Sequence, residues 1–490
     1  MSDGQHLLPG GWTSTTLREI AEVVGGLTKD AKKILGPGFR EVPYLRVANV
    51  QRGRLDLAEV KRIAASESDI QKLSLQPGDV LLNEGGDRDK LGRGWIWQGQ
   101  LRECIHQNHV FRARLHSRDI DPLYVAHFAN SIAQTYFAEH GSQTTNLASI
   151  SLTKLGSLPI RLPPSQEQKR IVAKLEELLS DLDAGVAELK AAQKKLAQYR
   201  QSLLKAAVEG ALTADWRAQH TPTETGAQFL ERILTERRAR WEARQLAKFK
   251  EQGKAPPKDW QKKYPEPVQP DITDLPEESE LPEGWVWARV AQLGHVQLGR
   301  QRSPSKVGKE NPTPYIRAAN ITEGGVDLTD VLEMEFSDTE KETFALKVGD
   351  VLLTEASGSP EHVGRPAIWK TTHGLFCFQN TVLRFSPEGI GSDYAFYSFL
   401  AMQKLGVFRR LSGGVGINHL SAGKFSALLV PLPPLDEQRA LVESIKERLS
   451  RCDDQLVVIA YALKQSTAQR QNILRAAFAG QLVPQTRVMP

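Results

Sequence analysis

The sequence has little cysteine and no long hydrophobic run. Its 490 residues include three cysteines, Cys104, Cys377 and Cys452, which lie far apart and form no C-x-x-C pair. Three isolated thiols argue against a disulfide framework and a structural zinc site, and they indicate a reducing compartment. No apolar run approaches the roughly 20 residues of a membrane-spanning helix. The opening residues, MSDGQHLLPGGW, have neither the basic nor the apolar segment of a secretory signal. We therefore expect a cytoplasmic protein that does not contact a membrane.

The motifs of common enzymes are absent as well. The sequence contains no Walker A loop, no G-x-G-x-x-G that opens a helix and no H-E-x-x-H. The two LPP segments, at residues 162–164 and 432–434, lack the acidic or amide residue and the aromatic residue of the amino-methyltransferase loop. A formal net charge of +5 permits a polyanionic partner without requiring one. We expect a binding protein with no catalytic residues, no metal and no cofactor of its own.

The second half of the sequence repeats the first. LPGGW at residues 8–12 resembles LPEGW at 281–285, and PYLRVANV at 43–50 resembles PYIRAANI at 314–321. GDVLLNE at 78–84 resembles GDVLLTE at 349–355, and QNHVFR at 107–112 resembles QNTVLR at 379–384. From Glu167 and Glu437 the match continues at a constant offset of 270 residues to Gly210 and Gly480. Because the period is far too long for a solenoid, the sequence predicts two large units in tandem.

The two copies differ most where loops are expected. After GDVLL the first copy has NEGGDRDKLGRGWIW and the second has TEASGSPEHVGRPAIW, and the segments after LPxGW also diverge. A shared scaffold with different loops is typical of recognition modules. We interpret the residues that recur in both copies as scaffold: Arg46 with Arg317, Asn49 with Asn320, and Cys104 with Cys377, the last pair as small core side chains.

Each module is followed by a long helical pattern. Pro163 and Pro164 precede the first, and Ser165 with Gln168 predicts a capping box. Apolar residues then recur at the 3–4 spacing of a coiled coil from Ile171 to Leu203, and again from Leu441 to Ile473. The simplest way to bury two equal apolar stripes in one chain is an antiparallel pair. The alternative is that each helix packs onto its own module.

The modules themselves have short β-like runs followed by a short helical pattern. Runs such as VPYLRVANV and HVFRARL are bounded by Gly, Asp or Pro. We predict an α+β fold in which each module is a mostly antiparallel sheet with short helices. The predicted boundaries are 1–164 and 281–434 for the modules, 165–212 and 435–490 for the long helices with the C-terminal tail, and 213–280 for a charged helix and Pro-rich linker.

That intervening segment contains a further helical pattern at residues 223–252. Phe229, Leu230, Ile233, Leu234 and Trp241 fall on one side of it, and several arginines fall on the others. The arginines could contact phosphate, but we favour a solvated charged face.

The set of duplicated motifs resembles the specificity subunit of type I restriction–modification enzymes. The resemblance covers nearly the whole chain, including LPxGW, PY(L/I)R(V/A)AN, GDVLL, QN, LPPxxEQ, the closing AAxxGxL and the stretch LTADWRAQ. It implies two target recognition domains that each read one half of a bipartite, asymmetric DNA sequence. It implies paired helices that act as a spacer between the halves. The chain itself is then non-catalytic.

The resemblance also implies partners. These are double-stranded DNA, two modification subunits that methylate adenine with S-adenosylmethionine, and restriction subunits that use ATP and Mg²⁺. The place of action is the bacterial or archaeal cytoplasm, at the nucleoid.

We expect the DNA-reading residues in the divergent loops, because Arg pairs with guanine, and Asn or Gln with adenine. The candidates in the first module are Lys29, Lys32, Lys33, Arg88, Lys90, Arg93, Gln143, Thr144, Thr145 and Asn146. Those in the second module are Arg300, Arg302, Ser303, Lys306, Ser357, Ser359, Arg365, Asn418 and His419.

Two other functions stay open. One is a coiled-coil scaffold or adaptor that does not read DNA, which predicts no salt-dependent DNA affinity. The other is an enzyme with an unrecognised site, which predicts turnover without an added subunit.

Overall fold

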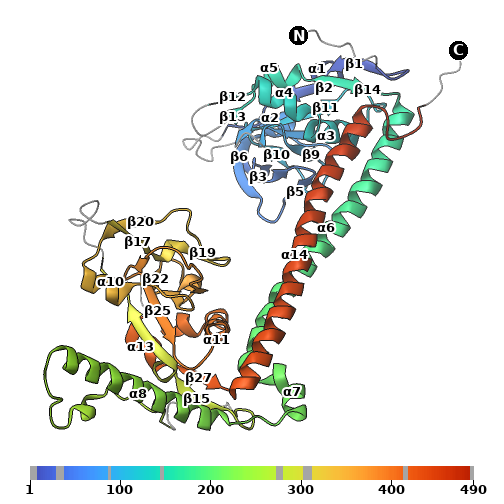
Figure 1. The fold of residues 1–490 in the computed structure, drawn as a ribbon. Coiled ribbons are helices and arrows are strands. Elements are labelled where there is room, and N and C mark those ends of the chain that lie inside the picture. The colour runs from blue at the N-terminus through green and yellow to red at the C-terminus, as the bar shows by residue number, and fades with distance from the viewer. Residues whose placement is uncertain are drawn as a thin grey trace. The chain divides into compact units, whose positions relative to one another are not determined.

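The computed structural model describes residues 8–28, 38–86, 90–143, 148–271, 280–301, 312–411 and 418–485, and it divides into two compact units (Figure 1). Unit 1 comprises residues 1–191 and 459–490, and unit 2 comprises residues 192–458. Each unit thus takes one module, the first part of the helix that follows it and the last part of the other long helix. The helices are α6 (Ser165–Val208) and α14 (Leu435–Phe478).

Unit 1 is built on a four-stranded antiparallel sheet in the order β2-β11-β7-β9. These strands are β2 (Ala21–Val24), β7 (Val80–Asn83), β9 (Gly94–Ile96) and β11 (Val110–Leu115). A second sheet, β10-β3-β6, contains β3 (Phe39–Leu45), β6 (Lys61–Ser66) and β10 (Ile105–His106). Two smaller ladders join β1 (Thr13–Thr16) to β14 (Pro159–Leu162) and β4 (Val50–Gln51) to β5 (Arg54–Leu55). A third small sheet has β13 (Ala148–Ser149) between β12 (Ser142–Gln143) and β8 (Gly85–Gly86). The helices are α1 (Leu17–Ile20), α2 (Glu67–Leu73), α3 (Pro122–Asn130), α4 (Ala133–His140) and α5 (Leu152–Gly156).

Unit 2 repeats this plan. Its main sheet, β16-β25-β21-β23, contains β16 (Gly294–Leu298), β21 (Val351–Thr354), β23 (Pro366–Ile368) and β25 (Val382–Pro387). The second sheet, β20-β17-β24, contains β17 (Pro312–Ile316), β20 (Leu332–Glu335) and β24 (Cys377–Phe378). The ladders are β15 (Val286–Arg289) with β27 (Leu429–Leu432), β18 (Ile321–Thr322) with β19 (Gly325–Val326), and β22 (Ala356–Ser357) with β26 (Asn418–His419).

The helices of unit 2 also follow those of unit 1, with one addition. They are α9 (Val290–Leu293), α10 (Asp338–Phe344), α11 (Ser392–Lys404), α12 (Val407–Leu411) and α13 (Ala422–Ala427). The added segment holds α7 (Ala214–Gln219), α8 (Gly226–Glu251) and a 3₁₀ turn, η3 (Trp260–Lys263). Among the described ladders only β3–β10 and β17–β24 are parallel, so the predicted α+β, mostly antiparallel fold is confirmed.

The strand register corrects the predicted match between two cysteines. In the parallel pairs, Ile105 lies opposite Tyr44 and Cys377 lies opposite Tyr315. Since Tyr44 and Tyr315 are equivalent, Cys377 corresponds to Ile105, and Cys104 falls one residue earlier. The prediction that both thiols belong to the core is confirmed, because both are buried.

The two long helices pair antiparallel within each unit. In unit 1, Arg470 of α14 pairs with Asp183 of α6, and in unit 2, Arg200 of α6 pairs with Asp453 of α14. Each helix start also packs on its own module: Ile171 and Leu441 are buried in the cores of units 1 and 2 respectively. Both proposed arrangements of the helices therefore occur together.

The end of each helix is inserted into the core of the other module. Phe478 of α14 contacts Tyr124 and Phe128 of α3 with ring centroids 5.3 Å apart in both cases. Gly480, two residues beyond the end of α14, has φ of 70°, and a Cβ there would lie 2.7 Å from Pro9. Gly210 holds the same place after α6, with φ of 72° and Pro282 at 2.5 Å, so any other residue is strained at either position.

The start of each long helix is fixed by a buried carboxylate. The indole of Trp12 donates to Glu167 at 3.0 Å, and that of Trp285 donates to Glu437 at 2.9 Å. Glu437 also accepts from Thr213 at 2.6 Å and pairs with Arg217 at 2.5 Å. Both carboxylates have no solvent exposure.

The predicted capping box at Ser165 is wrong. Ser165 already lies inside α6, and the side chain of Gln168 is used elsewhere. It donates to the Pro163 carbonyl at 2.8 Å and accepts from the Asp121 amide at 2.8 Å. The glutamine thus joins the helix start to the module rather than to its own first turn.

Removing the cation beside Glu437 should destabilise unit 2. Arg217→Met leaves the buried carboxylate with neutral donors only, and we expect a loss of about 3 kcal/mol in the free energy of unfolding. Chemical denaturation of the full chain measures this. Arg217→Lys, which keeps the charge, should lose less, and a loss below about 1 kcal/mol for Arg217→Met would contradict the assignment.

A buried histidine should make unit 1 sensitive to acid. Burial lowers the pKa of His106 to about 4, although its Nδ1 lies 2.6 Å from the Val110 carbonyl. Because the unfolded-state pKa is about 6.5, only the unfolded chain binds the proton between these values, so stability falls as the pH falls through this window.

We expect wild type to lose about 2 kcal/mol more than His106→Phe between about pH 7.5 and about pH 5. Phe378 occupies the equivalent position of β24, so phenylalanine is a matched replacement. Urea unfolding at the two pH values checks this, and identical pH dependence of the two proteins would refute it.

Candidate nucleic-acid interface

The structure brings the divergent segments of each module together. In unit 1, β8 follows the GDVLLNE strand and pairs with β13, which pairs with β12. In unit 2, β22 follows the GDVLLTE strand and pairs with β26. Two segments that lie about 60 residues apart in the sequence therefore form one small ladder at the same place in both units.

Many of the candidate DNA-reading residues lie outside the described residues. These are Lys29, Lys32, Lys33, Arg88, Thr144, Thr145, Asn146, Arg302, Ser303 and Lys306. Only the backbone of Gln143 and Asn418 is described. Gln143 of β12 lies opposite Ala148 of β13, and Asn418 of β26 lies opposite Ser357 of β22.

The described candidates of unit 2 gather around β22 and β26. Ser357 pairs with Asn418 across the ladder, and its hydroxyl accepts from the backbone amide of Ser359 at 3.1 Å. His419 lies next along β26, with 56% of its side chain exposed and its Nδ1 3.1 Å from Glu355. Ser357, Ser359 and His419 thus form a polar, partly exposed surface that is able to donate and accept hydrogen bonds.

A carboxylate–histidine pair recurs at this place, in addition to the predicted residues. In unit 2, Glu355 faces His419, and in unit 1 the equivalent Glu84 faces His109 at 2.5 Å. The repeated glutamate after GDVLL was a signal for it. The histidines were not, because they come from different segments: His109 follows β10 and His419 lies in β26.

The arginines of the two GR pairs lie at equivalent positions beside this surface. Arg93 donates to the Val47 carbonyl at 3.4 Å, and Arg365 donates to the Ile321 carbonyl at 3.4 Å. Glu323 lies close to Arg365, and its pKa is lowered mainly by Lys404, which lies 2.8 Å away, with a contribution from Arg365. Lys90 precedes Arg93, and its carbonyl accepts from the Arg93 amide at 3.3 Å.

Arg300 has a different environment from the other candidates. It is 8% exposed, donates to Glu340 at 2.6 Å and to the Glu335 carbonyl at 2.6 Å, and lies over the ring of Phe336. Its guanidinium therefore links β16 to the sheet that contains β20, which is a structural role.

The recurring asparagines are scaffold, as predicted. Asn49 accepts from the Arg46 amide at 2.9 Å and donates to two carbonyls of the following loop. Asn320 makes the same three hydrogen bonds, starting with the Arg317 amide at 3.1 Å. Both are 3% exposed, so neither is presented to a ligand.

The thiols of Cys104 and Cys377 are buried and are not presented at this surface. Burial raises the pKa of Cys104 to about 12 and that of Cys377 to about 11, so both thiols stay protonated and are poor nucleophiles. Within the described ranges, no group of three or more His, Cys, Asp or Glu residues is arranged to hold a metal ion. In the same part of the chain, no helix has both the length and the apolar character needed to cross a bilayer.

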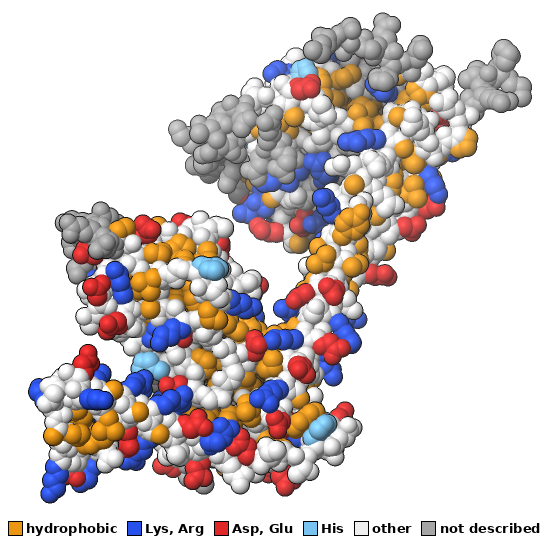
Figure 2. Space-filling model, in the orientation of Figure 1, with side chains coloured by type: hydrophobic (Ala, Val, Ile, Leu, Met, Phe, Trp, Pro, Cys, Tyr) orange, Lys and Arg blue, Asp and Glu red, His pale blue; other side chains and the backbone are white. Residues whose placement is uncertain are grey.

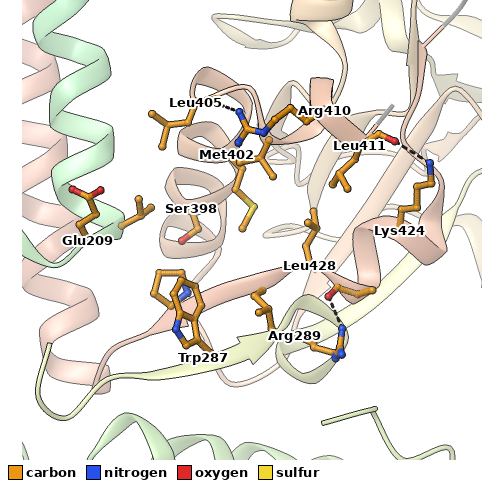
Figure 3. Close-up of a pocket in the computed structure, with 15 residues that line it drawn as sticks. Glu209, Trp287, Arg289, Ser398, Met402, Leu405, Arg410, Leu411, Lys424 and Leu428 are labelled. Atoms are coloured by element: carbon orange, nitrogen blue, oxygen red, sulfur yellow. Dashed lines mark hydrogen bonds between the residues drawn. The ribbon is translucent and has the colours of Figure 1, made fainter. Parts of the chain in front are cut away.

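Each unit also has a hollow at the junction of its edge ladder with the end of the inserted helix. In unit 2 it has a volume of about 670 Å³ and is lined by apolar side chains, including Met402, Leu405 and Leu428 (Figure 3). Basic side chains surround it, and Arg289 and Lys424 donate to backbone carbonyls at 2.8 and 2.9 Å.

The hollow of unit 1 lies at the equivalent place. Its volume is about 520 Å³, and seven lining residues match those of unit 2 at the 270-residue offset of the helices. The matches include Ile132 with Met402, Leu158 with Leu428, and Pro159 with Leu429. The scaffold thus carries an equivalent hollow in both units, although the loops after the GDVLL motif differ in sequence.

The model of the type I restriction modification DNA specificity domain family matches the chain twice, over residues 9–191 and 282–456. The chain is similar to the type I restriction enzyme EcoKI specificity subunit of Escherichia coli (strain K12), with 26% identity over 99% of this chain and 92% of that protein. It is also similar to the putative type I restriction enzyme MjaX specificity subunit of Methanocaldococcus jannaschii, with 21% identity over 97% and 94% of the two chains.

Solved structures share the fold. The HsdS subunit from Thermoanaerobacter tengcongensis has a TM-score of 0.53 and 16% identity, covering 98% of this chain and 100% of that one. A chain from a study titled "Structural basis underlying complex assembly and conformational transition of the type I R-M system" has a TM-score of 0.67 and 16% identity, covering 97% and 99% of the two chains.

Proposed function

The chain belongs to the type I restriction–modification DNA specificity family, and from that membership we propose that it reads a bipartite DNA sequence with its two modules. The specificity subunit of such systems is non-catalytic, and catalysis resides on partner subunits. Each module, within the predicted boundaries 1–164 and 281–434, reads one half of the target. The long helices α6 and α14 set the number of unread base pairs between the halves.

The observation that carries this proposal is the pairing of one scaffold with two different ladders. The main sheets, the buried asparagines and the helix starts are alike in both units. The segments that meet at β8–β13 and at β22–β26 differ in sequence. A scaffold that holds different polar loops at one place suits the reading of two different half-sites.

Within this surface the readers differ in kind. Ser357, Asn418 and His419 lie on the ladder and are candidates for base edges in unit 2. In unit 1 the candidate is Gln143, which lies in the neighbouring strand β12, opposite Ala148 of β13. The lysines and arginines of the loops are candidates for phosphate contacts, which set the register. Arg300 supports this surface from the core and does not reach DNA in this proposal.

Partner subunits are expected to dock at the parts that both units share. The two equivalent hollows support two copies of one partner per chain, which fits two modification subunits that bind S-adenosylmethionine.

The long helices have an exposed apolar site as well. Val457 and Val458 of α14 are 69% and 66% exposed, and exposed apolar side chains of this kind are typical of an interaction surface. Restriction subunits that use ATP and Mg²⁺ complete the proposed complex, which acts at the nucleoid.

The scaffold alternative assigns the helices and hollows to partners and gives the modules no DNA role. It leaves the sequence divergence at the two ladders without a purpose, and we therefore prefer the DNA-reading function.

Adenine methylation of genomic DNA tests the reading function. Cells with this chain and its methyltransferase partner should show methylation at two specified halves around a fixed run of unspecified bases, and deletion of this chain should abolish it. Exchanging residues 281–434 for the module of a relative should change one half only. Methylation that is unchanged by the deletion while the partner stays active would sink the proposal.

Charge placed in one hollow should displace one modification subunit. Leu429→Glu should reduce the reconstituted complex from two such subunits to one, Pro159→Glu should do the same at the other hollow, and the double variant should bind none. Native mass spectrometry measures the stoichiometry, and Leu429→Met is the matched control. Retention of two subunits by all variants would overturn the docking assignment.

A further inference from the structure

The second half of α8 and the segment up to Glu266 form an arm with an aromatic core of its own. Trp241 of α8 stacks on Trp260 of η3 with ring centroids 5.8 Å apart, and Tyr264 meets Trp241 edge-on at 5.5 Å. Phe249, near the end of α8, contacts Trp260 at 5.9 Å. These contacts fold the chain back along α8, so the arm is an ordered element rather than an open linker.

The first half of α8 attaches the arm to module 2. Phe229 and Ile233 have no solvent exposure and belong to the core of unit 2. Arg237 pairs with Glu388 at 2.5 Å and donates to the Ala291 carbonyl at 2.6 Å. Because α8 is a single helix, the arm is held in a fixed relation to the module that carries β22 and β26.

The arm is strongly basic. Residues 238–266 contain nine Lys and Arg residues and four Asp and Glu residues, an excess of five that equals the formal net charge of the entire chain. Figure 2 shows Lys and Arg side chains around this part of the molecule, at the lower left. The rest of the chain therefore has no formal net charge, and the arm accounts for the net positive charge of the protein.

These cations are mostly not neutralised by the protein. Arg238 pairs with Glu242 and Glu266, and Lys262 pairs with Asp259. The side chains at 240, 244, 248, 250, 254 and 258 are exposed, and none forms an ion pair with a described residue. Arg240, Arg244 and Lys248 follow one another at four-residue spacing, so they line one side of the helix.

We propose that this basic arm contacts the phosphate backbone of duplex DNA next to the half-site read by module 2. The inference rests on the proposed DNA-reading function. A row of unpaired cations on a rigid helix matches the regular negative charge of a duplex, and it adds affinity without sequence preference. The arm occurs once in the sequence, whereas the modules and long helices occur twice, so it suits a contact that one half-site makes and the other does not.

The test uses the chain assembled with its modification subunits. The variant Arg240→Gln, Arg244→Gln, Lys248→Gln removes three exposed charges and touches none of the arm's aromatic contacts. Its affinity is measured by fluorescence anisotropy over a series of salt concentrations. One duplex ends at the second half-site, and another extends about two helical turns beyond it.

The plot of log K against log salt has a negative slope, and on the extended duplex the magnitude of this slope should decrease by about 2 to 3 in the variant. The affinity of the variant at moderate salt should be at least about tenfold lower than that of wild type. On the duplex that ends at the half-site, wild type and variant should bind equally. The control Arg240→Lys, Arg244→Lys, Lys248→Arg keeps the charge and should keep the wild-type slope.

Two results would overturn the inference. One is an equal slope for wild type and variant on the extended duplex. The other is loss of a modification subunit from the variant in native mass spectra, which assigns the arm to an acidic protein surface instead. Failure of the proposed function looks different, because wild type itself then shows no preference for the methylated target over unrelated DNA.

Discussion

The hydrogen bond from a tryptophan indole to a buried glutamate at the start of each long helix is the constraint on which the arrangement depends. Glu167 and Glu437 lie where the module chain turns into the helix, and each receives the indole N–H of the tryptophan in its module's LPxGW motif. A buried carboxylate is tolerated only with such donors, so this bond fixes the helix start against the first strand of its module. The neighbouring glutamines, through Pro163 and Pro433, tie the same turn to the preceding strand.

The start of each long helix is fixed on its own module, and its far end packs into the core of the other module of the same chain. Phe478 fills the core of unit 1, and Leu203 with Ala207 contributes to the core of unit 2. Neither module core is complete within its own repeat. The two joints are chemically unequal, since Glu437 has Arg217 as a cation and the second oxygen of Glu167 has no hydrogen-bond partner in the described part of unit 1.

The sequence was sufficient for features that repeat or follow a period, and it was insufficient for features that depend on register. The modules, the long helices and the buried side of α8 followed from motif order and apolar spacing. The predicted match of Cys104 with Cys377 was wrong by one residue. It rested on the two residues being of the same type, whereas the strand register, which only the structure shows, matches Cys377 with Ile105. The capping box was wrong because the side chain of Gln168 bonds instead to the Pro163 carbonyl and to the amide of Asp121, which lies 47 residues earlier in the sequence. For Arg300, a basic residue beside a divergent loop gave no sign that Glu340 and Phe336 would enclose it.

The division between recurring and diverging residues also has an energetic side. The recurring polar residues, such as Asn49 and Asn320, are buried and bonded to backbone groups, so their replacement costs stability in either unit. The diverging residues of β8, β12, β13, β22 and β26 lie on two-residue ladders whose hydrogen bonds are between backbone groups, and a change of side chain there leaves the ladder intact. Under the proposed function, one half of the target could therefore change without a change in the buried bonds at the helix starts or in the other module.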